Sequence, residues 1–371
     1  MKYYLIAGEA SGDLHASNLM KEIRELDNEA DFRFWGGDLM KKQGGKLVKH
    51  YRDLAFMGFI EVLLNIREIA ENLRFCKKDI KKFQPDVVIL VDYPGFNLRI
   101  AKFVKASGIR VFYYISPQLW AWRSSRVNTI KRHVDKMFVI LPFEKEFYEK
   151  HGYQVDFIGH PLLDLLSNEL QLLDKESLIK KNNLDRRPII ALLPGSRRQE
   201  IKKMLGIMLQ TSEYFPHFQF VVAAVPSIPP GFYKKISKHF HVSIIYNQTY
   251  DLLKLADAAL VTSGTATLET ALIGTPQVVC YKGSYLSYLV ARMVVHVEFI
   301  SLVNLIMEKR VITELVQENL TRENLVLELK KILDDNHYRE TILYDYSLLK
   351  EKLGGAGASA KAARLIVQYL L

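Results

Sequence analysis

The stretch KYYLIAGEASGDLHASNLMKEIREL, residues 2–26, predicts the fold class. Its first six residues form an apolar run typical of a buried strand, residues 8–13 form a glycine-containing loop, and the apolar spacing of 14–26 predicts a helix. A strand, a loop and a helix in this order are the repeating unit of a parallel sheet, because parallel strands need a long crossover connection.

The same alternation continues along the chain. The pattern predicts helices at 62–83, 96–107 and 200–214, and strands at 32–35, 86–91, 110–115, 136–141, 189–193, 218–224, 242–245, 258–261 and 277–281. A polar stretch, 167–187, separates the two series. We therefore expect an α/β fold of two Rossmann-like doubly wound domains, 1–165 and 166–345, facing a ligand-binding cleft, and a terminal segment, 346–371.

Composition excludes several classes of protein. The 371 residues are 49% hydrophobic and 25% charged, which is ordinary globular usage and argues against disorder. Two cysteines exclude a disulfide framework, and neither lies near other thiols or histidines at metal-binding spacing. We expect no transmembrane helix and no signal peptide, and hence a cytoplasmic protein. The net charge of +10 favours an anionic partner, which composition leaves open as nucleic acid, a phosphate-bearing substrate or an acidic membrane.

Three loops of the first half are candidates for chemistry. The glycines of residues 8–13 permit close backbone approach, and the helix that follows offers free N–H groups to an anion. The alternative is that Ser11-Gly12-Asp13 only caps that helix. Asp92 follows a buried strand directly, so its carboxylate is a candidate general base, or else a cap for the helix that starts near Phe96. A third loop, 116–123, carries two tryptophans that either line a sugar or apolar pocket or only seal the loop.

The second half contains the strongest local signal. Residues 193–200, LPGSRRQE, place a glycine, a hydroxyl and two guanidinium groups at a helix N-terminus. Arginines there oppose the helix dipole, so a diphosphate is the natural compensation. In residues 262–270, Glu269 either accepts hydrogen bonds from a ribose diol or completes a capping box. The isolated His15 and His160 are explained by local backbone contacts, and no cluster predicts a metal.

Nine segments carry a resemblance to a known family. They are GEASGDLHA (8–16), FMGFIEVL (56–63), VDYPGFN (91–97), YYISPQLWAWRSSRV (113–127), LPFEKEFYEKHG (141–152), FIGHPLLD (157–164), LLPGSRRQEI (192–201), SGTATLETALIGTPQVVCYK (263–282) and SLVNLI (301–306). In this order they resemble segments of lipid-A-disaccharide synthases, glycosyltransferases with two Rossmann domains (the GT-B fold). SPQLWAWR and LPGSRRQE are the most specific, whereas SGTATLE also occurs in other UDP-sugar enzymes.

The resemblance implies a reaction. UDP-2,3-diacylglucosamine donates its sugar to the 6-hydroxyl of 2,3-diacylglucosamine 1-phosphate, giving a β-1,6-linked disaccharide 1-phosphate and UDP. It implies an inverting transferase that needs no metal or other cofactor and lies peripherally on the cytoplasmic side of the inner membrane.

The resemblance also implies roles for individual residues. Asp92 is the expected base. The expected sugar and acceptor residues are Gly8, Glu9, Ser11, Gly12, Gln118 and Trp120. The expected UDP and diphosphate residues are Ser196, Arg197, Gln199, Glu200, Thr265, Ala266, Glu269 and Asn304.

An apolar segment, 56–66, fits a lipid substrate. It has too many large apolar residues for one helix face, and we expect Met57, Phe59, Ile60 and Leu63 to contact the membrane or acyl chains. The lysines of 77–82 follow and would meet anionic lipid. The alternative is that the apolar residues are packed core and the lysines a solvated face.

The sequence departs from the family pattern at two places. Val303 stands where the family commonly has proline, and Glu308-Lys309-Arg310 replaces a common Gly-Arg-Glu, which leaves the basic role of Lys309 or Arg310 open. The terminal helix, 357–371, resembles the one that crosses back to the first domain in GT-B enzymes. Its exchange between subunits would make a homodimer.

Two other functions compete. A UDP-N-acetylglucosamine 2-epimerase-like enzyme shares the fold and the nucleotide loop, but has no need of the apolar 56–66 segment. A nucleic-acid-binding protein would suit the net charge, but needs a basic stripe with stacking aromatic residues, and here the basic residues are scattered. We therefore expect no nucleic-acid partner.

Overall fold

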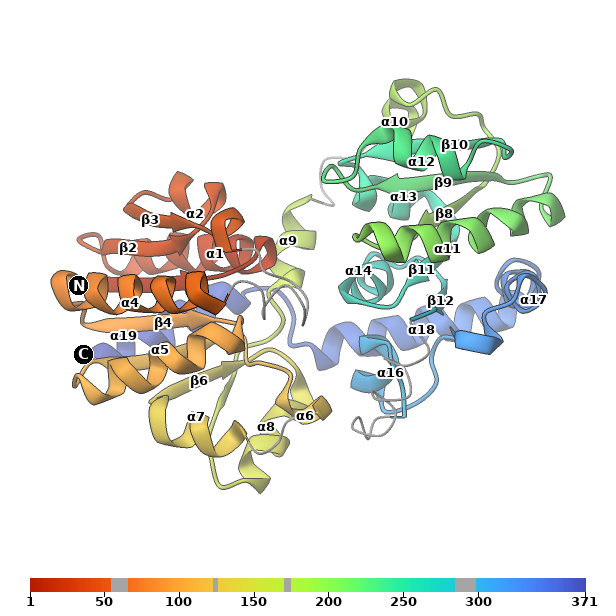
Figure 1. The fold of residues 1–371 in the computed structure, drawn as a ribbon. Coiled ribbons are helices and arrows are strands. Elements are labelled where there is room, and N and C mark those ends of the chain that lie inside the picture. Colours follow the sequence, from red (N-terminus) through yellow and green to blue (C-terminus); the bar gives the residue numbers. More distant parts are fainter. Residues whose placement is uncertain (55–65, 123–125, 170–174, 284–297) are drawn as a thin grey trace. The chain divides into compact units, whose positions relative to one another are not determined.

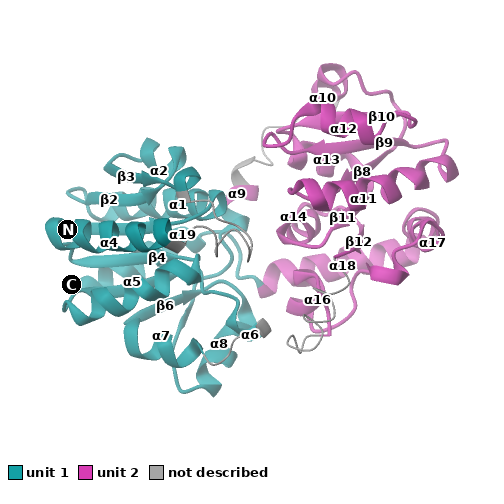
Figure 2. Ribbon diagram, viewed as in Figure 1, with its two compact units in different colours: residues 1–164, 353–371 teal, residues 165–352 magenta. Residues whose placement is uncertain are grey.

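The computed structural model describes residues 1–54, 66–122, 126–169, 175–283 and 298–371 (Figure 1). The chain forms two compact units, coloured separately in Figure 2. Unit 1 comprises Met1–Asp164 and Leu353–Leu371, and unit 2 comprises Leu165–Lys352.

Unit 1 is built on a parallel sheet with the strand order β3-β2-β1-β4-β5-β6-β7. Its strands are β1 (Lys2–Ala7), β2 (Asp31–Gly36), β3 (Lys46–His50), β4 (Val87–Val91), β5 (Arg110–Tyr114), β6 (Lys136–Val139) and β7 (Asp156–Phe157). The strand order reverses between β1 and β4, where Ala7 pairs with Val91. Loops leaving two such strands diverge to opposite faces, which opens a crevice for ligands at their carboxyl ends.

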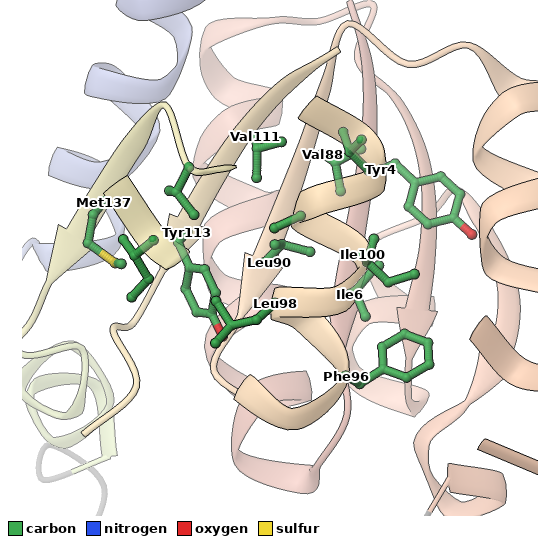
Figure 3. Close-up of a cluster of buried hydrophobic side chains, with 14 of the residues drawn as sticks. Tyr4, Ile6, Val88, Leu90, Phe96, Leu98, Ile100, Val111, Tyr113 and Met137 are labelled. Atoms are coloured by element: carbon green, nitrogen blue, oxygen red, sulfur yellow. The ribbon is translucent and has the colours of Figure 1, made fainter. Parts of the chain in front are cut away.

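Helices cover both faces of this sheet. They are α1 (Ala10–Leu26), α2 (Asp38–Lys42), α4 (Ile66–Phe83), α5 (Pro94–Ala106), α6 (Leu119–Trp122), α7 (Val127–His133), α8 (Pro142–Lys150), α9 (Leu162–Glu169, which runs into unit 2) and α19 (Ala358–Leu370). Alternate residues of β1 face opposite sides, as the strand period requires. Tyr4 and Ile6 pack under α4 and α5, whereas Tyr3 and Leu5 pack under α1 and α19. Figure 3 shows the first of these clusters, with Phe96 beside Ile6.

The C-terminal helix α19 belongs to unit 1, which confirms the predicted return to the first domain. It packs on α1 through small residues, including Ala362 and Ala363. The carboxylate of Asp164 caps its N-terminus by accepting hydrogen bonds from the backbone N–H groups of Gly357, Ala358 and Ser359. Residues 346–352, which we expected to begin the terminal segment, are instead the end of α18 in unit 2.

Unit 2 repeats the architecture with the strand order β10-β9-β8-β11-β12-β13. Its strands are β8 (Ile189–Leu193), β9 (Gln219–Ala224), β10 (Val242–Tyr246), β11 (Ala256–Thr262), β12 (Gln277–Tyr281) and β13 (Glu314–Val316). Its helices are α10 (Lys175–Lys181), α11 (Arg198–Gln210), α12 (Pro230–Ile236), α13 (Thr249–Leu255), α14 (Thr265–Ile273), α16 (Leu302–Met307), α17 (Arg322–Asp334) and α18 (Asn336–Lys352). The order reverses between β8 and β11, where Leu193 pairs with Val261. The predicted fold class of two doubly wound parallel-sheet domains is thus confirmed.

Three strands, β3, β7 and β13, were not predicted. Each lies at or near a sheet edge and is short or polar, so it lacks the apolar run that marks a central strand. Helix α1 begins at Ala10 rather than near residue 14, because Glu9 already has the extended conformation of an N-cap. Ser11 and Gly12 therefore lie in the first turn of a helix and not in a loop.

Candidate functional site

The loops after β1 and β4 meet at the switch point of unit 1. A Cβ atom at Gly8 would lie 2.4 Å from the Tyr93 ring, so glycine permits this close approach. Glu9 is the N-cap of α1 but makes no side-chain capping hydrogen bond. Ser11 is exposed beside it, and Gly12 is buried against Ala7. The free amides of this first turn therefore lie beside the Asp92 loop, in an arrangement suited to an anion.

The neighbouring Asp13 has a structural role. Its buried carboxylate accepts hydrogen bonds from the backbone N–H groups of Gly37, Leu39 and Met40, at 2.7–3.1 Å, and so caps α2. The alternative prediction from the sequence is that Ser11-Gly12-Asp13 only caps the helix that follows it. Asp13 is indeed a capping residue, but the helix that it caps is α2 and not α1.

Asp92 lies on a strained turn. Asp92 and Tyr93 both have left-handed backbones, with φ of 42° and 49°. Two side chains hold this turn: Asn97 Nδ2 donates to the Asp92 carbonyl at 2.7 Å, and the Tyr113 hydroxyl donates to the same oxygen at 2.5 Å. The N-cap of α5 is Tyr93, so the Asp92 side chain is not used as a cap. Non-glycine residues adopt this conformation mainly where the surroundings enforce it, which is common at functional sites.

The environment of Asp92 suits a base. Burial and, to a lesser extent, the negative charge of Glu9 raise its pKa from the ordinary range to about 6. A carboxyl group with this pKa is ionised at neutral pH and accepts a proton more readily than an ordinary aspartate.

The loop after β5 carries Gln118 and Trp120. Gln118 is exposed, whereas Trp120 is partly buried with its ring edge-on to Phe143 at 4.9 Å between centroids. Trp120 therefore packs the loop against α8, as the second interpretation of the tryptophans proposed. Arg123 lies outside the described residues, as do the side-chain surroundings of Trp122.

A pocket of about 370 Å³ lies at the switch point of unit 2. It is lined by the turns after β8 and β11, by the end of β9 and by the start of α13. The residues are Leu193, Gly195, Ser196, Arg197, Glu200, Ala223, Val225, Thr249, Thr262, Ser263, Gly264, Thr265, Ala266 and Glu269. It thus brings together six of the eight predicted nucleotide residues, and leaves out Gln199 and Asn304. A second pocket, of about 310 Å³, shares Thr249 and Glu269 with the first and continues along 247–251.

The turn after β8 already holds a negative charge. The Glu200 carboxylate accepts hydrogen bonds from the backbone N–H groups of Ser196 and Arg197, both at 3.3 Å, and pairs with the Arg197 guanidinium at 3.2 Å. Arg197 is 69% exposed, and such surface pairs contribute at most about 1 kcal/mol. These donors, which we expected to bind a diphosphate, therefore bind the Glu200 carboxylate. Because these contacts are weak, a diphosphate can displace the carboxylate at a small cost in free energy.

Asn304 is used within the protein. Its amide nitrogen donates to the Ile312 carbonyl and to Glu314, and its amide oxygen accepts from the Val311 and Ile312 backbone N–H groups, all at 2.9–3.0 Å. Glu314 also accepts from the backbone of Ile300 and Ser301 at the start of α16. The Ile300 carbonyl in turn accepts from the Ser263 hydroxyl, whose residue lines the pocket. Asn304 therefore fixes α16 near the pocket.

The basic residues after α16 have different surroundings. Lys309 pairs with the buried Asp345 at 2.7 Å and so ties this segment to α18, whereas Arg310 is exposed. In unit 1, Lys77 and Lys81 lie over the Phe103 ring, which accounts for two lysines of the basic run. Met57, Phe59, Ile60 and Leu63 lie outside the described residues.

Neither a metal-binding cluster nor a membrane-spanning helix is present among the described residues. Within the described ranges, no three His, Cys, Asp or Glu side chains are grouped so as to hold a metal ion. In the same ranges, no helix combines the length and apolar character needed to span a bilayer.

A family model described as lipid-A-disaccharide synthetase matches residues 3–366. The chain belongs to the lipid-A-disaccharide synthase family. It is 41% identical to the lipid-A-disaccharide synthase of Syntrophus aciditrophicus over 97% of this chain and 95% of that one. It is 36% identical to the enzyme of the same name from Geobacter sulfurreducens, over 99% and 96% of the two chains.

Solved structures of an epimerase and of a glycotransferase share the fold of this family member. A UDP-GlcNAc 2-epimerase from Neisseria meningitidis aligns with a TM-score of 0.64 at 15% identity, covering 100% of this chain and 99% of that one. The glycotransferase of kitacinnamycin aligns with a TM-score of 0.66 at 11% identity, covering 100% and 96%. At these identities the likeness concerns the fold alone.

The sequence patterns of this lipid-A-disaccharide synthase family member did not predict several residues of the site. Val225 follows β9 and Thr249 lies after β10, and both line the pocket because these strands lie in the order β10-β9-β8, a neighbour relationship that no local motif reveals. Asn97 and Tyr113 hold the Asp92 turn. A signal for Asn97 did exist, because an amide in the first turn after a strand–Pro–Gly junction is well placed to bind the preceding carbonyls.

Proposed function

We propose that the protein transfers the sugar of UDP-2,3-diacylglucosamine to the 6-hydroxyl of 2,3-diacylglucosamine 1-phosphate. The product is the β-1,6-linked lipid A disaccharide 1-phosphate, and UDP is released. The observation that carries the proposal is family membership over residues 3–366, at up to 41% identity to a relative of this name. The switch-point pocket of unit 2 gives a place for UDP.

Asp92 is the general base of the proposed reaction. Its carboxylate takes the proton of the acceptor 6-hydroxyl as that oxygen bonds to C1 of the donor sugar. The C1–oxygen bond to UDP breaks on the opposite side, so the configuration at C1 inverts. Since the pKa of Asp92 is about 6, most of the group is ionised at neutral pH and ready for this step.

The turn after β8 stabilises the leaving diphosphate. Arg197, the Ser196 hydroxyl and the backbone amides bind the phosphates once Glu200 is displaced. Gln199 lies close by in sequence, and Thr265 and Ala266 line the same pocket. Glu269, which lines both pockets, accepts hydrogen bonds from the ribose hydroxyls. Asn304 acts by holding α16.

Unit 1 binds the acceptor sugar. Gly8 and Glu9 lead into α1, Ser11 and Gly12 offer amides of its first turn to the acceptor phosphate, and Gln118 and Trp120 border the sugar. The acyl chains and the membrane are met by Met57, Phe59, Ile60 and Leu63, so the protein acts peripherally on the cytoplasmic face of the inner membrane. A homodimer is proposed from the family resemblance, and light scattering of the purified protein tests it.

A disaccharide-synthesis assay in detergent micelles with EDTA tests the function. Wild type should form disaccharide and UDP, and Asp92→Asn should lose turnover by at least a hundredfold while retaining UDP binding. Asparagine keeps the size of the side chain and tolerates a left-handed backbone, so the variant isolates the loss of the base. A wild-type protein that is inactive on both lipids but interconverts UDP-N-acetylglucosamine epimers would overturn the proposal in favour of the epimerase-like alternative.

A further inference from the structure

Glu144 is a buried carboxyl group to which the proposed reaction gives no role. It lies in the first turn of α8 and is 1% exposed. Its Oε2 accepts hydrogen bonds from the backbone N–H groups of Leu141 and Ile140 at 2.9 and 3.2 Å. Its Oε1 accepts from the Ser116 hydroxyl at 2.6 Å. One oxygen thus caps its own helix, and the other reaches the loop after β5.

The surroundings of Glu144 are polar on the loop side. The Trp120 indole N–H and the Tyr148 hydroxyl are both buried and make no hydrogen bond of ordinary geometry within the described chain. Burial raises the pKa of Glu144, and Ser116, the two backbone amides and Trp120 each offset part of that rise, which leaves the pKa at about 7. Trp120 therefore lies near enough to interact with the carboxylate, in addition to its contact with Phe143.

The loop has few other anchors before Gln118. Ile115 has a left-handed backbone, with φ of 65°, and its N–H donates to the Phe138 carbonyl at 3.1 Å. Beyond that point, the buried Ser116 hydroxyl links the loop to Glu144 at 2.6 Å and lies 3.4 Å from the Pro117 carbonyl. A helix cap alone needs neither the Ser116 contact nor a carboxyl group whose charged form is costly to bury.

We propose that Glu144 is a positioning residue, which through Ser116 and Trp120 sets the conformation of residues 116–120 and so the placement of Gln118 against the acceptor sugar. The inference rests on the proposed function, because it assigns the acceptor to this loop. Glu144 itself touches neither substrate.

Steady-state kinetics with the acceptor varied test the proposal. Ser116→Ala removes the loop contact but leaves the α8 cap, and should raise the acceptor KM about tenfold with a smaller change in kcat. Glu144→Ala should do the same and also lower the Tm. Glu144→Gln retains an acceptor for the amides and a polar group for Ser116, and should stay within about threefold of wild type. The double variant with Ser116→Ala and Glu144→Ala should show no larger acceptor KM than Glu144→Ala alone, because both substitutions remove the same contact.

Asp79→Asn is the matched control, because Asp79 is also a buried carboxylate of unit 1 and pairs with Arg33 away from this loop. It should lower the Tm and leave the acceptor KM unchanged. If Ser116→Ala and Glu144→Ala lower only the Tm, Glu144 is merely structural and the inference is overturned.

A second readout separates this inference from the proposed function. The fluorescence of Trp120, taken as wild type minus Trp120→Phe, should shift and become more open to acrylamide quenching in Ser116→Ala. If Ser116→Ala shows this fluorescence shift but the wild-type protein has no transferase activity, the transferase function is rejected and the role of Glu144 in the loop stands. An unchanged Trp120 signal with an active wild type would reject the positioning role alone.

Discussion

Asn97 Nδ2 donates a 2.7 Å hydrogen bond to the carbonyl oxygen of Asp92. The same nitrogen lies 3.2 Å from the Val91 carbonyl. One buried amide thus binds both the last residue of β4 and the turn after it. The backbone of Asp92 is left-handed, and this contact helps to offset the strain of that conformation. Asn97 therefore holds the backbone that carries the side chain of the proposed base.

Asn97→Ala should therefore impair both stability and turnover. The buried Val91 and Asp92 carbonyls lose a donor, which costs about 1–3 kcal/mol in the free energy of unfolding. Release of the turn should lower kcat at least tenfold, as measured by urea unfolding and the micelle assay. Tyr113→Phe is the matched comparison, because it removes the second donor to the same oxygen and should have the smaller effect. An unchanged kcat for Asn97→Ala would show that the turn does not depend on this contact.

The rate should depend on pH through Asp92. Its ionised form is the base, so kcat/KM should rise with pH up to about 6 and then level off. Burial is the larger cause of the raised pKa, and Glu9 is the second. Glu9→Gln should therefore lower the pKa of Asp92 in part, so that kcat/KM begins to fall at a lower pH than in wild type. This displacement does not depend on how the substitution changes the maximal kcat/KM. A fall at the wild-type pH would separate Glu9 from the titration of Asp92.

Arg197→Ala should weaken UDP binding by about ten- to a hundredfold, because a charge-assisted hydrogen bond contributes about 1.5–3 kcal/mol. Calorimetric titration with UDP measures it. Arg198→Ala is the control: the next guanidinium lies over the Phe232 ring and does not line the pocket, so its loss should change affinity less than threefold. Glu200→Gln should leave UDP affinity equal or tighter, since it removes a competing charge. Equal losses for the two arginines would argue against the assigned turn.

The stability of unit 1 should fall in acid because of His160. Burial and, to a lesser extent, the neighbouring His15 lower its pKa to about 3, so the unfolded chain takes up the proton first. The contribution of His160 is complete above about pH 6.5 and is lost as pH falls towards 3, by about 2 kcal/mol between pH 7.5 and 5. His160→Asn keeps an acceptor for the Leu162 N–H and should flatten this part of the urea-unfolding profile. A variant with the wild-type slope would exclude His160 as the cause.

Substituting Met57, Phe59 and Leu63 together with serine should release the protein from anionic vesicles, because interfacial binding scales with the apolar area inserted. Co-sedimentation with vesicles measures this. Leu327→Ser in α17 is the control for loss of an exposed leucine, since that side chain is 54% exposed in unit 2. Retained sedimentation of the triple variant would place membrane contact elsewhere.

The central strands were predictable because each is an uninterrupted apolar run that two helical layers bury. Val87–Val91 and Ile189–Leu193 are examples, and all ten of their residues are buried. The loops that follow them were predictable as sites for the same reason, since parallel strands end at one edge. The edge strand Lys46–His50 carries no such signal because its neighbours on one side are solvent and polar side chains.

The sequence by itself determined the alternation of strands and helices, the loops that carry chemistry and the family to which the chain is similar. These follow from local patterns of apolar and turn residues, which are written along the chain. Only the tertiary structure decided that Glu200 holds the Arg197 turn, that Asn97 and Tyr113 share the Asp92 carbonyl, and that Glu144 joins α8 to Ser116. Such hydrogen bonds depend on side-chain directions and strand order, which sequence spacing leaves open. At the Asp92 turn and at Glu144, burial makes them strong enough to hold a strained backbone or to shift a pKa.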